Sequence, residues 1–257
     1  MRLCSPHRLR LRRYWPGLAT LGVLTAFSTD PAAAQAADTM TVLFVGNSLT
    51  YWNDLPGMVE SLLLEDGMAA RIGSVVGPNM GLEDHWREGV VFDSLRADGW
   101  DVVVMQQGPS ATEGRPSLLR WSALFADSIV AWGARPALYM VWPSEVRRRD
   151  FPGVIDSYAT AADQIDGLLF PVGAAWGQVM AEDPTIPLYG PDRFHPAPPA
   201  SYLAALIIHQ QLVGTDPTSL APGRGLERLA LDRLGLSPDQ VGVLRRAAAD
   251  ANARYAR

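Results

Sequence analysis

The sequence predicts an α/β protein: a three-layer α/β/α sandwich around a doubly wound parallel sheet of about five strands. Two observations carry this prediction. Short apolar runs of the kind that form buried strands alternate along the chain with longer stretches of helical periodicity. The order strand, helix, strand, helix recurs about five times, which is typical of parallel sheets with helices on both faces.

Five short runs are predicted to form the strands. In chain order they are 41–45, 71–76, 101–107, 136–142 and 168–173. The third, DVVVMQQ, is the clearest, because a parallel sheet buries continuous β-branched runs on both faces. The first, TVLFV, leads directly into Gly46, Asn47 and Ser48. A buried strand therefore ends on a small residue, an amide and a hydroxyl.

Helical spacing predicts the connections between these strands. The predicted helices are 55–66, 82–97, 117–134, 154–165 and 200–214, followed by a last helix after Ser237. Asn53 or Asp54 is expected to cap the first helix, which has Pro56 in its first turn. Ser237 and Gln240 have the spacing of a capping box, which predicts where the last helix begins.

The first 36 residues are predicted to be a secretory signal peptide. Five arginines precede the twelve-residue apolar run 17–28, and PAAAQA at 31–36 offers small residues for cleavage after Ala36. That run is too short to span a bilayer, which needs about 20 residues. Residues 37–257 contain no repeat, low-complexity stretch or linker, so we expect a single secreted or periplasmic domain. An uncleaved anchor and twin-arginine export, suggested by Arg12-Arg13, remain alternatives to cleavage and to the general secretory route.

The composition of 37–257 argues against several classes of function. Removing five arginines and one aspartate with the signal peptide leaves 17 basic and 26 acidic residues, a net charge of −9. No basic stripe remains, so a nucleic-acid partner is not expected. Cys4, the single cysteine, lies in the signal peptide, so we expect neither disulfides nor thiolate chemistry. The sequence has no metal-binding motif, P-loop or dinucleotide fingerprint, so no metal and no cofactor are predicted, nor is an integral membrane segment after cleavage.

One histidine lies where a catalytic base would be useful. Ester hydrolysis by a serine needs a base, a carboxylate that orients the base, and donors that stabilise the oxyanion. His195 lies in the loop GPDRFHP (190–196) with Asp192 three residues earlier, so one segment can supply both base and carboxylate. The other histidines fall in the signal peptide or in predicted helices, where packing or surface roles are simpler: His7, His85 and His209.

Ser48 is a candidate nucleophile because of the order of the blocks around it. It is not in a G-x-S-x-G elbow, since no glycine follows two residues later, and alone it could be an ordinary turn. The glycine-bearing loop 75–81 follows the second strand, the amide-rich stretch 105–110 follows the third, and Asp-x-x-His-Pro comes late. Ligands bind at the carboxyl ends of open parallel sheets, where these blocks are expected to meet.

With these blocks in this order, residues 41–215 resemble the SGNH (GDSL-type) hydrolase superfamily, in particular a branch of exported bacterial proteins. The resemblance implies a flavodoxin-like fold. It also implies that Ser48 is the nucleophile and supplies a backbone oxyanion donor, that His195 is the general base and then acid, and that Asp192 orients His195. The carboxylate assignment stays open, since another residue could orient the imidazole.

The remaining oxyanion donors are less specific. The resemblance implies a backbone N–H from Gly77, with Gly81 as the alternative. The third block departs from the family's Gly-x-Asn-Asp, because Gly108 is followed by proline and serine. Gln106 or Gln107 would then have to supply the side-chain amide.

The resemblance implies an exported serine esterase that forms an acyl-enzyme and acts on a small acyl ester, such as an acetyl group on a small molecule or glycan. Asn47 and Trp142 are candidate substrate contacts. For Trp142, and for Trp52 and Trp176, packing in the core is the alternative. Two rival functions are a non-catalytic glycan-binding module on the same fold and a lipase or phospholipase, which would need an exposed apolar rim.

Overall fold

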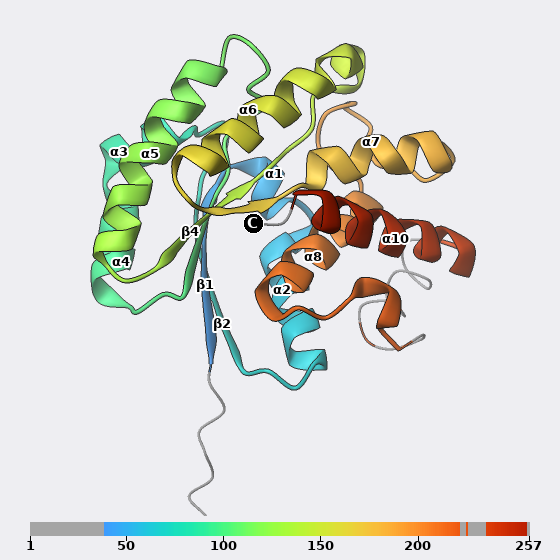
Figure 1. Cartoon of the computed structure of the whole chain (residues 1–257), viewed down its shortest axis with the longest axis horizontal. Helices are drawn as coiled ribbons and strands as arrows, with labels where there is room; N and C mark the ends of the chain where they lie inside the picture. The colour runs from blue at the N-terminus through green and yellow to red at the C-terminus, as the bar shows by residue number, and fades with distance from the viewer. Residues whose placement is uncertain (1–38, 222–224, 226–234, 256–257) are drawn as a thin grey trace, which may run out of the picture. The chain divides into compact units, whose positions relative to one another are not determined.

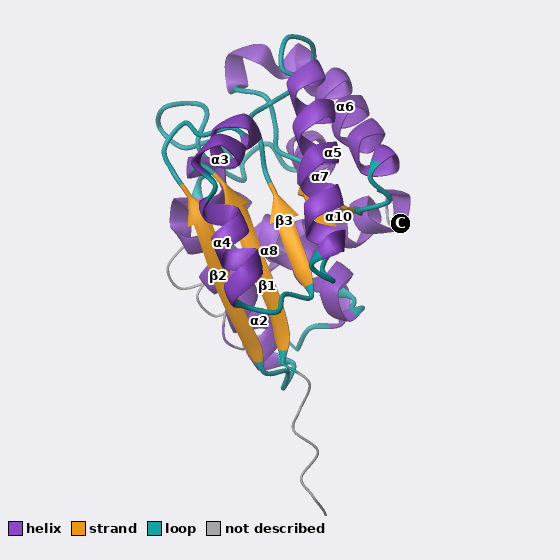
Figure 2. Ribbon diagram, turned by 90° about the vertical axis from the view of Figure 1, so that its left-hand side faces the viewer, coloured by secondary structure: helices purple, strands orange, loops and turns teal. Residues whose placement is uncertain are grey.

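The computed structural model describes residues 39–221, 225 and 235–255, which belong to one compact unit, Ala37–Arg257. The predicted signal peptide, with Cys4, lies outside the described residues. Within the unit, five strands form one all-parallel sheet in the order β2-β1-β3-β4-β5 (Figures 1 and 2). The strands are β1 (Met40–Gly46), β2 (Ala70–Val76), β3 (Val102–Met105), β4 (Arg135–Tyr139) and β5 (Leu168–Phe170). The predicted fold class is confirmed.

Helices flank the sheet on both faces. Figure 1 shows α3, α4 and α5 on one face and α2, α8 and α10 on the other. The α-helices are α1 (Ser48–Tyr51), α2 (Leu55–Glu65), α3 (Leu82–Glu88), α4 (Val90–Ala97), α5 (Arg115–Ala131), α6 (Phe151–Gln164), α7 (Val172–Glu182), α8 (Pro198–Val213) and α10 (Pro238–Tyr255). Short 3₁₀ helices are η1 (Trp52–Asp54), η2 (Glu145–Asp150) and η3 (Pro217–Ser219).

The central strands are buried from both sides, as the continuous apolar runs predict. Phe44 of β1 pairs in register with Val104 of β3, and neither is more than 1% exposed. Full burial of one such side chain contributes about 1.5–3 kcal/mol. The last helix also begins as predicted: Gln240 N–H donates to Ser237 Oγ at 3.2 Å, and Ser237 N–H donates to Gln240 Oε1 at 3.0 Å.

The predicted strands 101–107 and 136–142 are shorter in the structure, Val102–Met105 and Arg135–Tyr139, and two other predicted elements differ more deeply. The predicted helix 82–97 is broken in two at Gly89, whose φ of 77° ends α3 in the left-handed conformation. The predicted strand 168–173 stops after three residues. Pro171 lacks an N–H for the ladder and instead precedes α7, a helix that the apolar pattern did not separate from the strand. Among the described residues, no helix is both long and apolar enough to cross a membrane.

The candidate site lies where the strand order reverses, between β1 and β3, at the carboxyl edge of the sheet. Gly46 ends β1, and a Cβ there would meet Gln106 Oε1 at 2.5 Å and Thr50 Oγ1 at 2.6 Å. A glycine is therefore needed for the residue after β3 to approach the end of β1. The loop 190–196 closes on itself through an antiparallel bridge between Tyr189 and Pro196.

Candidate active site

Ser48 begins α1 directly after β1 and is largely buried. Asn47 caps this helix, since its Oδ1 accepts from Leu49 N–H at 3.1 Å. Its Nδ2 donates to the carbonyl of Met80 at 2.8 Å, which ties the turn that holds Ser48 to the loop after β2. Both ends of the Asn47 amide are thus engaged within the protein. The side chain of Asn47 helps to build the turn, and a contact between Asn47 and substrate stays a prediction.

The structure brings Ser48, His195 and Asp192 together. His195 Nε2 lies 2.8 Å from Ser48 Oγ, although the two residues are 147 positions apart in the chain. His195 Nδ1 contacts Asp192 Oδ2 at close hydrogen-bonding range. The other carboxylate oxygen, Oδ1, accepts from the N–H groups of Phe194 at 3.0 Å and His195 at 2.9 Å. The loop therefore turns Asp192 back toward the imidazole.

The environment of Asp192 favours its charged form. The hydrogen bond with the His195 side chain is the largest cause that lowers the pKa of Asp192 below its ordinary value, and the two backbone N–H groups add to it. An ionised carboxylate can only accept, so the network assigns the proton of His195 to Nδ1. Nε2 is then the acceptor for the Ser48 hydroxyl. This is the arrangement that a serine nucleophile and its general base need.

Several contacts hold the loop that carries His195. Gly190 N–H donates to the carbonyl of His195 at 2.7 Å. Arg193 adopts a φ of 63°, and its Nε donates to Glu145 Oε2 at 2.7 Å while its carbonyl accepts from Glu145 N–H at 2.9 Å. Trp142 Nε1 donates to the carbonyl of Phe194 at 3.0 Å. The two residues before His195 are thus held by groups that follow β4.

Trp142 does not line a cleft. It is completely buried and stacks on Trp176 with ring centroids 3.6 Å apart. The candidate role of Trp142 as a substrate contact is therefore wrong, because the indole is enclosed by the core. It contributes to the site indirectly, through its hydrogen bond to the loop beside His195.

The expected backbone donor after β2 is already engaged. Gly77 N–H donates to the carbonyl of Gly46 at 3.2 Å, which continues the β1–β2 ladder one residue past the strand. Gly81 N–H donates to Asp84 Oδ2 at 2.8 Å in the cap of α3. The structure contradicts the expectation that the N–H of Gly77 is free for an oxyanion, and the alternative, Gly81, is engaged as well. In the described part of the chain, the N–H of Ser48 has no acceptor, as expected in a first helical turn.

The two glutamines after β3 are both buried but bonded differently. Gln106 Oε1 accepts from Asn47 N–H at 2.9 Å and from the Thr50 hydroxyl at 2.8 Å. Its Nε2 is buried and has no acceptor among the described residues. Gln107 Nε2 lies 3.4 Å from Ser110 Oγ and 3.5 Å from the carbonyl of Gly114. Gln107 Oε1 also accepts from Leu82 N–H at 3.4 Å. Gln106 therefore shapes the turn that holds Ser48, whereas Gln107 joins its own loop to the start of α3.

Three residues beyond the predicted set also support the site. His85 is buried, and its Nε2 hydrogen-bonds to the carbonyl of Gly46 at 2.8 Å. Trp52 stacks on the His195 ring with centroids 4.4 Å apart. Asn53 Nδ2 donates to the carbonyl of Pro196 at 2.9 Å. From the sequence, packing or capping roles were the simpler expectation for these three residues. Only the fold shows that His85 lies beside Gly46 and that Trp52 and Asn53 lie beside the His195 loop.

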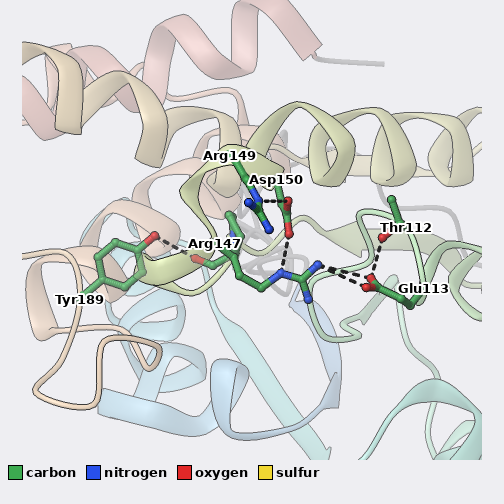
Figure 3. A network of polar contacts seen from close by, with 7 residues as sticks. Thr112, Glu113, Arg147, Arg149, Asp150 and Tyr189 are labelled. Atoms are coloured by element: carbon green, nitrogen blue, oxygen red, sulfur yellow. Dashed lines mark hydrogen bonds and ion pairs between the residues drawn. The ribbon is translucent and has the colours of Figure 1, made fainter.

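A pocket of about 220 Å³ opens beside the loop 190–196, and its walls include Pro109, Pro143, Arg147 and Phe194. Figure 3 shows Arg147 reaching toward two carboxylates there. Its Nε donates to Asp150 Oδ2 at 2.5 Å, and its terminal nitrogen lies 3.4 Å from Glu113 Oε2. Arg147 is thus already paired with Asp150 and Glu113, and these ion pairs join the segments that form the wall of the pocket.

Metal-ligating side chains do not gather elsewhere in the described part of the chain. Residues 39–221, 225 and 235–255 contain no group of three or more histidine, cysteine, aspartate or glutamate side chains placed to hold a metal ion.

No protein-family model matches the chain, and no curated protein is significantly similar to it in sequence. Solved structures are similar in fold. A "putative SGNH hydrolase" from Slackia heliotrinireducens is 28% identical, with a TM-score of 0.60 over 67% of this chain and 98% of that one. A DUF4886 family protein from Bacteroides uniformis is 16% identical, with a TM-score of 0.68 over 83% and 95%.

A variant of an acetyl-xylooligosaccharide esterase from Geobacillus is 14% identical, with a TM-score of 0.53 over 68% of this chain and 94% of that one. At identities this low, the second and third likenesses show the fold alone. Together these structures make the chain similar in architecture to SGNH and GDSL-type hydrolases, as the sequence blocks predict.

Proposed function

We propose that the chain is an exported serine esterase of SGNH type that hydrolyses the ester of a small acyl group. One observation carries the proposal: His195 Nε2 lies 2.8 Å from Ser48 Oγ while Nδ1 is bonded to Asp192. A binding module gains nothing from this alignment, because recognition needs no activated hydroxyl. The fold shared with esterases adds support.

The first half of the proposed reaction forms an acyl-enzyme. Ser48 Oγ attacks the ester carbonyl carbon while His195 Nε2 takes the hydroxyl proton. A new C–O bond gives a tetrahedral intermediate, and Asp192 stabilises the imidazolium. As the intermediate collapses, the bond to the alcohol breaks and His195 returns its proton to the leaving alkoxide. The alcohol departs, and the acyl group stays on Ser48.

In the second half, His195 takes a proton from water, which attacks the acyl carbonyl. The bond to Ser48 then breaks, its oxygen regains a proton from His195, and the acid leaves. Both halves develop negative charge on the carbonyl oxygen, so both need hydrogen-bond donors aimed at it. The proposed donors are the N–H of Ser48 and the Nε2 of Gln106, the glutamine whose amide hydrogens have no acceptor among the described residues. Loss of one such donor typically costs about 10²–10³ in turnover.

Export and substrate are further parts of the proposal. The order of charged, apolar and small residues in 1–36 supports a cleaved signal peptide, followed by a single domain over 37–257 that is secreted or periplasmic. A small acyl ester of a carbohydrate, with acetyl as the first case, is supported by the fold shared with an acetyl-xylooligosaccharide esterase. That likeness is one of fold, so the substrate rests on analogy.

The test compares the full chain with Ser48→Ala on p-nitrophenyl acetate, butyrate and octanoate. The matched control is Ser94→Ala, because among the described residues the Ser94 hydroxyl bonds only to the carbonyl of Val90 within α4. We expect hydrolysis by the wild type and the control, with acetate preferred, and none by Ser48→Ala. Equal activity in the wild type and Ser48→Ala would exclude Ser48 as the nucleophile. A preference for octanoate would favour a lipase over the esterase proposed here.

A further inference from the structure

Trp52 is an exposed aromatic residue that lies flat on the proposed base. Its ring stacks on that of His195 with centroids 4.4 Å apart and an interplanar angle of 23°. Even so, 42% of the residue is exposed. Tryptophan is highly buried on average, as Trp142 and Trp176 are here; Trp132 is also exposed, at 49%, but it does not stack on a residue of the site. The indole therefore covers one side of the imidazole and offers the rest of its surface to solvent.

The backbone after Trp52 is held in an unusual conformation. Asn53 and Asp54 have φ values of 56° and 57°, and residues with side chains adopt such values at a cost. Asn53 Nδ2 bonds to the carbonyl of Pro196 and to Ser201 Oγ, and Asp54 Oδ1 accepts from Gly57 N–H. None of these bonds uses the indole. The segment is thus fastened without Trp52, whose ring contacts His195 on one side and is open to solvent on the rest.

The chemistry of the proposed reaction places the leaving alcohol near this ring. His195 must return its proton from Nε2 to the alkoxide, so the alcohol oxygen has to come within about 2.6–3.2 Å of that nitrogen. Because Trp52 stacks on the same imidazole, the atoms attached to the alcohol oxygen lie beside the indole. The acyl carbonyl instead faces the donors near Ser48. Trp52 is therefore on the alcohol side of the site.

Resting on the proposed esterase function, we propose that Trp52 is the platform for the alcohol part of the substrate and that this alcohol is a neutral sugar ring. One face of a pyranose presents C–H groups to the indole, while its hydroxyls stay in water. A half-exposed platform suits such a ligand, whereas a long acyl or alkyl alcohol would need a deep apolar groove. Two charged groups around the His195 loop are paired within the protein, Asp192 with His195 and Arg193 with Glu145, so neither of them calls for a charged ligand.

The test uses two acetates that share the acyl group and differ in the alcohol: a fully acetylated methyl glucopyranoside and ethyl acetate. The full chain is compared with Trp52→Ala, Trp52→Phe and the control Trp132→Ala, which changes a similarly exposed tryptophan at the C-terminal end of α5. We expect Trp52→Ala to lower kcat/KM for the sugar acetate relative to ethyl acetate by about tenfold, Trp52→Phe by less, and the control not at all.

An equal fall for both acetates would overturn the inference, because it would mean that Trp52 only supports His195. Unchanged kcat/KM values for both acetates would overturn it as well, because the indole would then contribute nothing to either substrate. If Trp52→Ala does not fold, Trp52→Phe and Trp52→Leu carry the same comparison, with Leu expected to lose more than Phe. If the wild type hydrolyses neither acetate, the proposed function itself fails; the inference about Trp52 alone fails only where the wild type is active.

Discussion

The side chain of Asn53 joins the segment after Ser48 to the loop that carries His195. It donates to the carbonyl of Pro196 at 2.9 Å and to Ser201 Oγ at 3.0 Å, and its φ is 56°. Two hydrogen bonds contribute about 1 kcal/mol each, or about 2 kcal/mol in total. Alanine in the left-handed conformation costs about 1 kcal/mol more. We therefore predict that Asn53→Ala lowers the free energy of unfolding by about 3 kcal/mol, and Asn53→Gly, which tolerates that backbone, by about 2 kcal/mol.

The matched control is Asn79→Ala. Asn79 is exposed and has a φ of 59°, so this change measures the backbone cost without the two bonds. Urea unfolding gives the free energies, and p-nitrophenyl acetate hydrolysis gives kcat/KM. Because a misplacement of about 1 Å can cost about 10² in rate, Asn53→Ala should also lose at least tenfold in kcat/KM, while Asn79→Ala should lose none. If Asn53→Ala is no less stable than Asn79→Ala, the two bonds do not hold the loop.

Three further predictions concern neighbouring groups. Asp192→Asn should lower kcat by up to about 10⁴ with the fold intact, because the amide favours the wrong imidazole tautomer; a loss below tenfold in ester assays would point to another carboxylate. Burial is the largest cause that lowers the pKa of His209. As the pH falls, the imidazole is therefore protonated in the unfolded chain before it is protonated in the folded one. The free energy of unfolding should therefore be highest above about pH 6.5 and decrease as the pH falls below that value. In His209→Gln, the free energy measured by urea unfolding should depend less on pH in this window; the same pH dependence as in the wild type would contradict the prediction. His85→Leu removes the donor to Gly46 and should cost about 1–3 kcal/mol in the same assay, whereas a neutral change would show that the bond contributes nothing.

The layered fold follows from local patterns that a sequence displays directly. The run 101–107 is apolar and β-branched because β3 is covered on both faces. The spacing of Asp192 and His195 is local too, so a single turn brings them into contact. Their approach to Ser48 required the parallel topology, which places the ends of β1 and the late loop at one edge of the sheet.

The oxyanion donors could not be read from the sequence. Whether the N–H of Gly77 is free depends on whether the β1–β2 ladder runs one residue further, and it does. Gly81 looked equivalent, but its N–H is taken by the cap of α3. Trp142 and Trp52 show the same limit, because both indoles lie near strand ends and only packing decides that one is enclosed and the other exposed. These outcomes depend on register and on neighbours distant in the chain.

The most direct measurement is covalent labelling by a fluorophosphonate, which reacts only with an activated serine. Wild-type protein should take up one probe per chain, and peptide mass spectrometry should place it on Ser48. Labelling should vanish in Ser48→Ala and slow strongly in His195→Ala. A wild-type chain that stays unlabelled, or an adduct on a different serine, would contradict the claim that His195 and Asp192 activate Ser48 as a nucleophile.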